Sequence, residues 1–403
     1  MLFTRLYFPL AFGYAISYFY RNTNAIIEKD LAKELLLGPA DLGLLTSVYF
    51  ISFAAFQLPL GVLLDRYGPR RTESILLLFA ALGALIFAKS ESLHGLIIGR
   101  LLIGLGVSAC LMSAFKAYVI WFPTERLPII NGLQMVAGGI GALGATVPLQ
   151  NALLYTDWRG VFIGLSLITV LSSVFIWFLL PENNIKTQKK TSLKLQIQEI
   201  RQILKSITFW RIAPLAAVSS GANMAIHGLW MRPWLRDVLG LDNDDSAKLL
   251  FLMTLTFIVG FLTMGVFSER LFKLFGIRPI SISVFGMTIF IFLQGIMIYG
   301  DSLNPSALVI LLGFFGTSSF LVYAAYAQIF PKILFGRVST TLNLMVFIGA
   351  FILQWGIGAI IGIWPETSIG YNPESYKAAI GVIFIIQTLG LIWYFMSKKF
   401  DKK

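Results

Sequence analysis

The stretch "GVLLDRYGPRR", residues 61–71, decides how the rest of the chain is interpreted. It holds Asp65, Arg66, Arg70 and Arg71 in a chain of which only 13% is charged, and strongly apolar runs lie on both sides of it. A plain connecting loop needs only polar residues. The glycines that space these charges therefore indicate a loop with a specified conformation and specified contacts.

Apolar residues dominate the chain around this stretch. Of the 403 residues, 57% are hydrophobic, and the mean hydropathy is +0.78. A soluble domain cannot bury that much apolar surface, whereas apolar runs of about twenty residues span a membrane as helices. We therefore predict an all-α integral membrane protein with twelve transmembrane helices in two six-helix halves. The expected spans are 5–32, 42–64, 72–89, 93–121, 128–152, 159–180, 207–235, 246–267, 279–299, 305–330, 337–363 and 376–396.

The net charge of +12 would suggest nucleic acid as a partner if the protein were soluble. Here most Lys and Arg residues lie in short loops on one side of the expected membrane. Cytoplasmic loops are the ones enriched in Lys and Arg. We therefore expect no nucleic-acid partner, a multi-pass protein of the cytoplasmic (inner) membrane, and both termini in the cytoplasm.

The longest expected loop, 181–206, separates an N-terminal bundle, 1–180, from a C-terminal bundle, 207–403. Within it, Leu193, Ile197, Ile200 and Leu204 fall on one helical stripe. This pattern predicts a short amphipathic helix on the cytoplasmic membrane surface. A solvated basic linker with some helix is the alternative.

The stretch 61–71 has a partial copy in the second half. Gly265 begins "GVFSERLFKLFGIRP", and each copy follows the second span of its half. Gly61, Asp65 and Arg66 correspond to Gly265, Glu269 and Arg270, although the next glycine, Gly276, comes four residues later than its counterpart Gly68. Two six-span halves with corresponding loops are typical of transporters.

Taken together, these motifs resemble the major facilitator superfamily over essentially the whole chain. The stretch 61–71 is similar to its signature loop, and "GRLLIGLG" (99–106) to its fourth-span motif. The resemblance implies that 61–71 acts as a conformational latch, closing the cytoplasmic side while the cavity opens outward. Its residues would be Gly61, Asp65, Arg66, Gly68, Arg70, Glu269 and Arg270, with Asp65 bonded to a helix N-terminus of the opposite half. Alternatively, the arginines only enforce topology.

Polar residues at membrane depth indicate where a cargo would bind, because each is costly there. Tyr18, Arg21 and Asn24 lie on one polar face of the first span, and Arg100 lies at a similar depth in the fourth. Two arginines would make a positive pocket suited to carboxylate or phosphate. For Arg100, a structural bond to a carbonyl or tyrosine of the first span is the alternative.

The second half offers Asn223, His227 and Trp230 on one face of the seventh span, and Tyr323 in the tenth. His227 could carry a coupling proton, because the ordinary pKa of histidine is near 6.5. A neutral histidine that hydrogen-bonds between helices is an equal alternative, and packing is the commoner role for residues such as Tyr323.

No Asp or Glu falls in the central part of any expected span, which favours an anionic cargo over a cationic one. The fifth span, "GGIGALGATVP" (138–148), lacks the adjacent Gly-Pro of the superfamily's drug antiporters. There is no phosphate-binding loop and no cluster of histidines. We therefore expect no enzyme activity, cofactor or metal.

These observations predict a monomeric secondary transporter in the lipid bilayer that moves a small organic anion by alternating access. The cargo would be a carboxylate, a polycarboxylate metal chelate or a phosphorylated metabolite, taken up by proton symport or in exchange for a counter-anion. Two alternatives remain open: efflux of drug-like or amphipathic compounds, and a transporter-like sensor without turnover.

Overall fold

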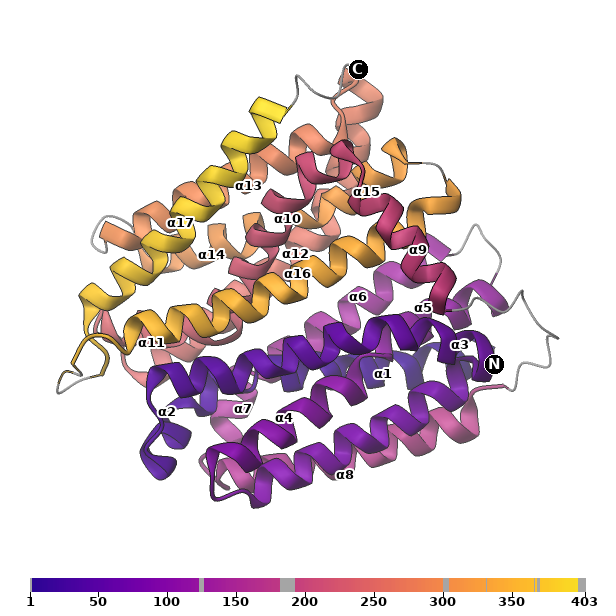
Figure 1. Cartoon of the computed structure of the whole chain (residues 1–403). Coiled ribbons are helices and arrows are strands. Elements are labelled where there is room, and N and C mark those ends of the chain that lie inside the picture. The colour runs from indigo at the N-terminus through magenta and orange to yellow at the C-terminus, as the bar shows by residue number, and fades with distance from the viewer. Residues whose placement is uncertain are drawn as a thin grey trace. The chain divides into compact units, whose positions relative to one another are not determined.

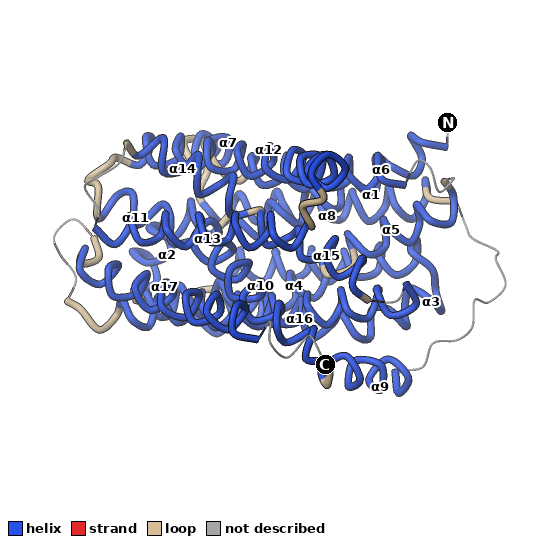
Figure 2. The backbone as a smooth tube through the Cα atoms, turned by 90° about the horizontal axis from the view of Figure 1, so that it is seen from above, coloured by secondary structure: helices blue, strands red, loops and turns tan. Residues whose placement is uncertain are grey.

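Helices form all the regular structure of the residues that the structure describes. The computed structural model describes residues 2–122, 127–181, 193–299, 304–330, 332–365, 367 and 370–397. The helices follow one another through short connections (Figure 2), and the predicted all-α class is confirmed. The chain divides into two compact units, Met1–Leu37 with Leu45–Leu195, and Gly38–Leu44 with Gln196–Lys403.

In the first unit, most of which is coloured indigo to magenta in Figure 1, α1 (Leu2–Asn22) packs along α6 (Leu127–Gly144) and α8 (Trp158–Leu179). The contact between α1 and α6 depends on Gly141, because a Cβ there would lie 1.9 Å from the carbonyl oxygen of Ala15. Small residues allow such close approach of membrane helices. The unit also contains α2 (Asn24–Leu35), most of α3 (Pro39–Lys89), α4 (Leu93–Val107), α5 (Cys110–Trp121) and α7 (Val147–Ala152).

In the second unit, α10 (Ile207–Ala225) packs along α16 (Lys332–Ile361) and α17 (Pro373–Met396), and α12 (Asn243–Phe275) packs along α14 (Pro305–Gly316). Gly221 lets α10 approach α16, since a Cβ there would lie 2.9 Å from the backbone of Ala350. The other elements are a π-helical turn (Ile226–Trp230), α11 (Met231–Asp237), α13 (Pro279–Tyr299), a 3₁₀ turn (Ser318–Phe320) and α15 (Leu321–Ile329).

Several helices begin at side chains that cap their free backbone N–H groups. Ser92 accepts from the N–H of Gly95 at the start of α4, and Asp157 accepts from Gly160 at the start of α8. Such caps satisfy donors that have no partner within the helix. Further caps are Ser206 on α10, Asp242 on α12, Asn304 on α14 and Asn372 on α17.

Five of the expected spans are interrupted, namely the first, fourth, fifth, seventh and tenth. They break between α1 and α2, between α4 and α5, between α6 and α7, at the π-helical turn after α10, and at the 3₁₀ turn after α14. At four breaks a hydroxyl bonds a carbonyl oxygen three or four residues earlier: Thr23 to Phe19 (2.6 Å), Ser108 to Leu105 (2.7 Å), Thr146 to Leu143 (2.5 Å) and Thr317 to Phe314 (2.7 Å). Bonds of this kind bend helices.

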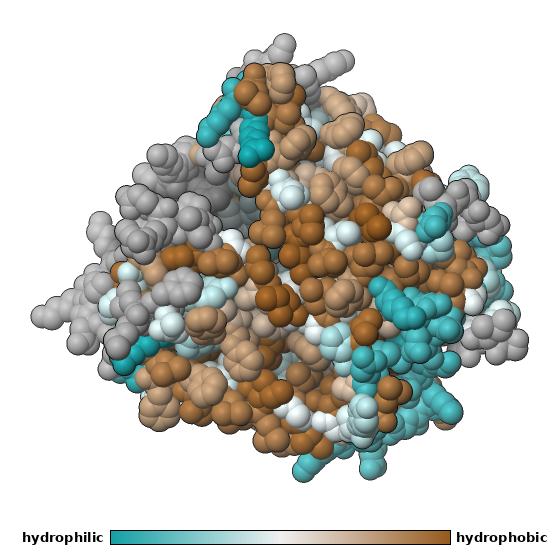
Figure 3. Space-filling model, turned by 180° about the vertical axis from the view of Figure 1, so that it is seen from behind, coloured by the Kyte–Doolittle hydropathy of each residue, from teal (hydrophilic) through white to brown (hydrophobic). Residues whose placement is uncertain are grey.

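Ten helical segments of the described residues are long and apolar enough to cross a membrane. The first and seventh expected spans are the two missing from that set, and both are among the interrupted ones. Apolar residues cover most of the face in Figure 3, with hydrophilic residues toward its margins. On α8, a stripe of Leu167, Leu171, Val174 and Phe178 is exposed as lipid contact requires.

The stretch 61–71 is helical on both sides of Gly68. We expected a loop at 65–71, but α3 is interrupted only at Gly68, whose φ is 75° and ψ 170°. Glycine adopts this conformation without steric cost, and Pro69 suits the first position of the helix that resumes. Gly276 ends α12 with a φ of 67°. The two copies therefore share a positive-φ glycine at the end of the second span.

The predicted amphipathic segment forms α9 (Leu193–Leu204). Ile203 is buried, whereas Arg201 and Leu204 are exposed. The side chains of Leu193 and Ile197 lie outside the described residues, as do residues 182–192. The position of α9 on a membrane surface stays a prediction.

Candidate functional site

Arg21, the first predicted anion ligand, lies in the last turn of α1 beside three aromatic rings. Its guanidinium carbon is 4.5 Å from the ring centre of Tyr18 and 5.9 Å from those of Tyr49 and Phe53. The hydroxyl of Tyr49 in turn donates to the carbonyl oxygen of Ser17 (3.3 Å). Aromatic faces hold a guanidinium by cation–π attraction without neutralising its charge. Arg21 is half-buried, so this charge lies at a partly accessible place on the interrupted first span.

Asn24, the other predicted ligand on this face, lies just beyond the break. Its side-chain N–H donates to the hydroxyl oxygen of Thr46 at 2.8 Å. Its side-chain oxygen Oδ1 is buried and has no hydrogen-bond partner among the described residues. Thr23, between α1 and α2, keeps right-handed helical backbone angles (φ −55°, ψ −38°) across the break.

Arg100, the second predicted arginine, is 1% exposed. Its Nη1 donates to the carbonyl oxygen of Tyr20 at 2.8 Å, and its guanidinium lies 5.0 and 5.4 Å from the rings of Phe87 and Phe162. This is the bond to the first span that the sequence offered as an alternative. Its Nε and Nη2 have no hydrogen-bond acceptor in the described part of the chain. A ligand role for Arg100 stays a prediction.

The three predicted residues of the seventh span are buried and contact three different helices. His227 shares a hydrogen bond of 2.8 Å with the hydroxyl of Thr254 on α12, and its ring stacks on Phe257. The indole N–H of Trp230 donates to the carbonyl oxygen of Gln354 on α16 (3.0 Å). Asn223 lies against Gly316 at the end of α14, where a Cβ would lie 2.3 Å from its amide oxygen. His227 and Trp230 lie on the π-helical turn, and such turns are frequent at functional sites.

Tyr323 in the tenth span is half-buried, and its hydroxyl donates to the amide oxygen of Asn343 on α16 at 3.3 Å. Nearby, Tyr326 is fully buried and donates to the carbonyl oxygen of Phe209 at 2.9 Å. Tyr326 therefore joins helices, while Tyr323 keeps a partly open position. The predicted cavity residues thus fall into two groups, one in each unit, each on interrupted spans.

The latch residues are described only in part. Arg66 is exposed beside the ring of Tyr67 (5.2 Å), and Arg70 is half-buried beside Trp177 (5.5 Å). Gly61 is half-buried within α3, and Arg270 is exposed on α12. The side chains of Asp65 and Glu269 lie outside the described residues, so their bonds in the latch stay predictions.

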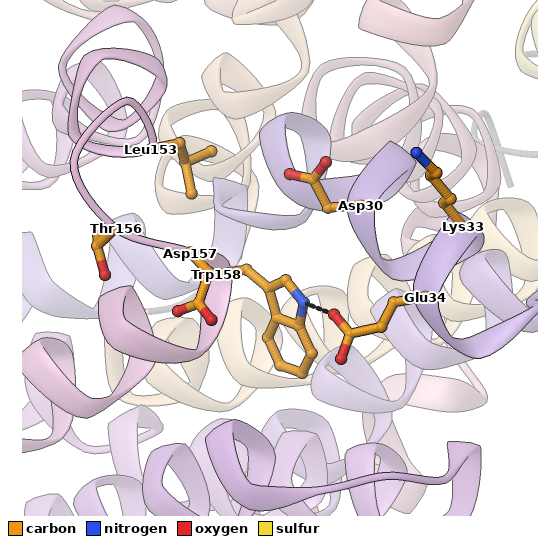
Figure 4. Close-up of a pocket in the computed structure, with 7 residues that line it drawn as sticks. All are labelled: Asp30, Lys33, Glu34, Leu153, Thr156, Asp157 and Trp158. Atoms are coloured by element: carbon orange, nitrogen blue, oxygen red, sulfur yellow. Dashed lines mark hydrogen bonds between the residues drawn. The ribbon is translucent and has the colours of Figure 1, made fainter.

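Figure 4 shows a pocket of about 520 Å³ in the first unit, lined by Asp30, Lys33, Glu34, Leu153, Thr156, Asp157 and Trp158. The indole N–H of Trp158 donates to Glu34 at 2.7 Å, and Arg159 bonds the other oxygen of the same carboxylate at 2.6 Å. Hydrogen bonds from Arg159 and Trp158 hold the pKa of Glu34 below its ordinary value. Arg159 also donates to the carbonyl oxygens of Ala88 and Ser90 at the end of α3. These residues join helix ends rather than form a ligand site.

The sequence did not predict one fully buried acidic residue, Glu73. Only acids in the central part of an expected span were taken as candidates for burial, whereas Glu73 is the second residue of the expected span 72–89. It follows the signature stretch by two residues, among other polar side chains. The run "RRTES" (70–74) gave the only signal, because it continues the polar sequence past the expected start of the helix.

Comparisons with known proteins agree with this architecture. The sequence profile of the Major Facilitator Superfamily matches residues 10–354. The hexuronate transporter of Escherichia coli K12 is 22% identical over 96% of this chain and 92% of its own length. The probable sulfoacetate transporter SauU of Cupriavidus necator is 23% identical over 75% and 74%. The probable nitrate/nitrite antiporter NarK1 of Thermus thermophilus is 24% identical over 91% and 77%.

Solved structures share the fold. A bacterial homologue of the human lysosomal transporter Spinster, in an inward-facing and unoccupied conformation, superposes with a TM-score of 0.79. The superposition covers 98% of this chain and 97% of that chain at 15% sequence identity. The D-xylose–proton symporter gives a TM-score of 0.74 at 13% identity. At such identities the likeness concerns the fold alone, and it confirms the predicted two six-helix halves.

Proposed function

Since the chain belongs to the Major Facilitator Superfamily, we propose that it is a secondary transporter that takes up a small organic anion by alternating access. The halves 1–180 and 207–403 would move about the linker 181–206, with both termini in the cytoplasm. The transporter would work as a monomer. Coupling would be proton symport or exchange for a counter-anion.

The observation that carries this proposal is the position of Arg21. A guanidinium stays charged at any physiological pH, and here three neutral aromatic rings surround it on an interrupted span. Such a charge attracts an anion and bonds carboxylate, sulfonate or phosphate oxygens in pairs. The names of the relatives point the same way, because sulfoacetate, hexuronate and nitrate are all anions.

In this proposal Tyr18 and Asn24 border the anion in the first half, together with Arg100. Asn223, His227, Trp230 and Tyr323 border it in the second. Interrupted helices expose backbone groups that can bind ligands, and transporters use such helices at their binding sites. Four of the five interrupted spans carry all eight of these residues.

Counterflow in reconstituted vesicles tests the proposal. Vesicles loaded with unlabelled sulfoacetate, galacturonate or nitrate are placed in a trace of the same labelled anion, and its entry is followed. We expect at least one probe to exchange, with at least a tenfold loss in Arg21→Ala, equivalent to about 1.4 kcal/mol of lost binding. Arg71→Ala is the matched control, since it removes an exposed arginine.

Normal anion exchange in Arg21→Ala would contradict the proposed site. Specific binding of the probes without any exchange in the wild type would contradict transport and favour the sensor. Exchange of amphipathic cations alone would favour the efflux alternative.

A further inference from the structure

Glu73 lies in the first unit, five residues beyond the kink at Gly68, on the part of α3 that is apolar enough to cross a membrane. Its side chain is 0% exposed. A carboxylate at such a place is costly unless a cation or several donors stabilise it. Its surroundings therefore decide which form of the acid the protein holds.

Helices α1 and α5 meet the carboxyl group of Glu73, and α8 lies close by. On α1, Gly13 leaves room for it, since a Cβ there would lie 3.0 Å from Oε1 of Glu73 and 3.5 Å from the hydroxyl of Ser172 on α8. On α5, the side chains of Ser113 and Cys110 face it. Ser113, Cys110 and Ser172 are all 0% exposed. We call Glu73, Cys110, Ser113 and Ser172 the Glu73 cluster.

Although Ser113 and Cys110 face Glu73, the oxygens of this cluster make no hydrogen bond of good geometry in the described part of the chain. This holds for both carboxyl oxygens of Glu73 and for the hydroxyls of Ser113 and Ser172. No ion pair joins Glu73 to a described Lys, Arg or His. The titratable groups that face it are Cys110 and Tyr118, both on α5, and neither is a cation at neutral pH.

These facts favour the protonated acid. A neutral carboxyl has an O–H to donate and an oxygen that accepts, so it can pair with a hydroxyl such as that of Ser113, which also donates and accepts. An ionised carboxylate in the same place would have the hydroxyl and thiol as donors but no countercharge, and a buried charge without one is far more costly than a buried neutral group. The Glu73 cluster is therefore suited to bind a proton on the carboxyl group, or a water molecule next to that group.

We propose that Glu73 binds and releases the proton that accompanies the anion, with Ser113 and Ser172 positioning its carboxyl group. This inference rests on the proposed function, and it names the coupling ion as H⁺. On release, the O–H bond of the carboxyl breaks and the proton passes to water that reaches the cluster from one side of the membrane. On binding, water from the other side supplies the proton. Glu73, rather than His227, would then carry the proton, and His227 would have the other role predicted for it, a neutral hydrogen bond between helices.

Infrared difference spectroscopy on the purified protein tests proton binding without any knowledge of the cargo. At pH 8 exposed carboxyl groups are ionised, so a remaining carbonyl band of a neutral acid reports a buried protonated group. We expect this band in the wild type and its loss in Glu73→Gln. Glu28→Gln is the matched control, because Glu28 is also buried in the first unit, and the band should persist in it. Absence of this carbonyl band from the wild type, or loss of the band in Glu28→Gln alone, would overturn the inference.

The same vesicles separate the inference from the proposed function. For a probe that the wild type exchanges, an inward proton gradient should accumulate it at least fivefold. Glu73→Gln should abolish this accumulation while counterflow, which needs no net proton movement, continues. Accumulation in Glu73→Gln, or loss of counterflow together with accumulation, would overturn the coupling role. Absence of any anion exchange in the wild type would contradict the proposed function and leave the infrared result to decide the proton site.

Discussion

Arg21 and Arg100 carry the same charge but have different surroundings. Arg21 is half-buried against aromatic rings, whereas Arg100 is enclosed and bonded to the carbonyl oxygen of Tyr20. This bond supplies a hydrogen-bond donor to a buried backbone carbonyl, which would otherwise lack one. The two arginines should therefore respond differently to substitution.

Arg100→Ala should lower the free energy of unfolding by about 1–3 kcal/mol, because it leaves the Tyr20 carbonyl without this donor in a buried place. Arg21→Ala should change unfolding much less and act instead on anion binding. Thermal unfolding in detergent, with and without each anion probe, measures both effects. Wild-type stability in Arg100→Ala would mean that this arginine is not a structural tie and would strengthen its assignment to the cargo.

At this scale the sequence predicted residue types better than partners. His227 was expected either to carry a proton or to form a hydrogen bond between helices. Its hydrogen-bond partner, Thr254, is 27 residues further along the chain. For Arg100 the sequence offered a carbonyl of the first span as an acceptor but not which one, and the acceptor, Tyr20, is 80 residues away. The neighbours of Glu73 come from three other helices. Such partners depend on how the helices pack, which the local pattern of residues does not contain.

Among the elements, the long helices could be predicted and their interruptions could not. Runs of apolar residues specify a membrane helix because the backbone must satisfy its own hydrogen bonds in lipid. The breaks at Thr23, Ser108 and Thr317 rest on single hydroxyls that bond a carbonyl of their own helix. Ser and Thr are also present in unbroken helices, where Thr263 makes a bond of the same kind within α12. The residue type alone therefore does not locate a break.

The kink in α3 gives a prediction with a matched control. Gly68→Ala places a Cβ on a residue with positive φ, which should lower the free energy of unfolding by about 1–2 kcal/mol. Gly265→Ala lies in the corresponding stretch within α12, where no atom is within 4 Å of the new Cβ. It should raise that free energy by up to about 1 kcal/mol, because alanine favours a helix over glycine. Thermal unfolding of both variants checks the opposite signs, and equal effects would show that the backbone conformation at Gly68 is not what matters.

For the whole molecule, hydropathy and the repeated stretch were enough to predict twelve helices in two halves. The cargo and the direction of transport could not be predicted in the same way. Under the proposed function they depend on the residues that bind the anion and on the relative free energies of the open states, and neither is set by one segment. The latch is where the sequence bears most directly on those free energies.

Asp65→Asn should shift the balance between the outward-open and inward-open states while leaving the fold intact. An exposed ionic contact contributes up to about 1 kcal/mol, and about 1.4 kcal/mol changes a ratio of states tenfold. We therefore expect a change of severalfold, toward the inward-open state. A cysteine introduced at Tyr18 reports it by its rate of labelling with a membrane-impermeant maleimide from each side. The native Cys110 is buried and should give little background.

Asp244→Asn is the control for this measurement, because it removes one negative charge from an exposed site in the first turn of α12. If the latch acts through its specific contacts, Asp65→Asn alone should raise labelling from the cytoplasmic side and lower it from the outside. Equal labelling of the two variants on both sides would mean that the charges of 61–71 serve only to orient the protein in the membrane. Gly68 has a positive φ whether or not the latch exists. In that outcome, the kink alone would account for the glycine, and Asp65 would need no partner in the opposite half.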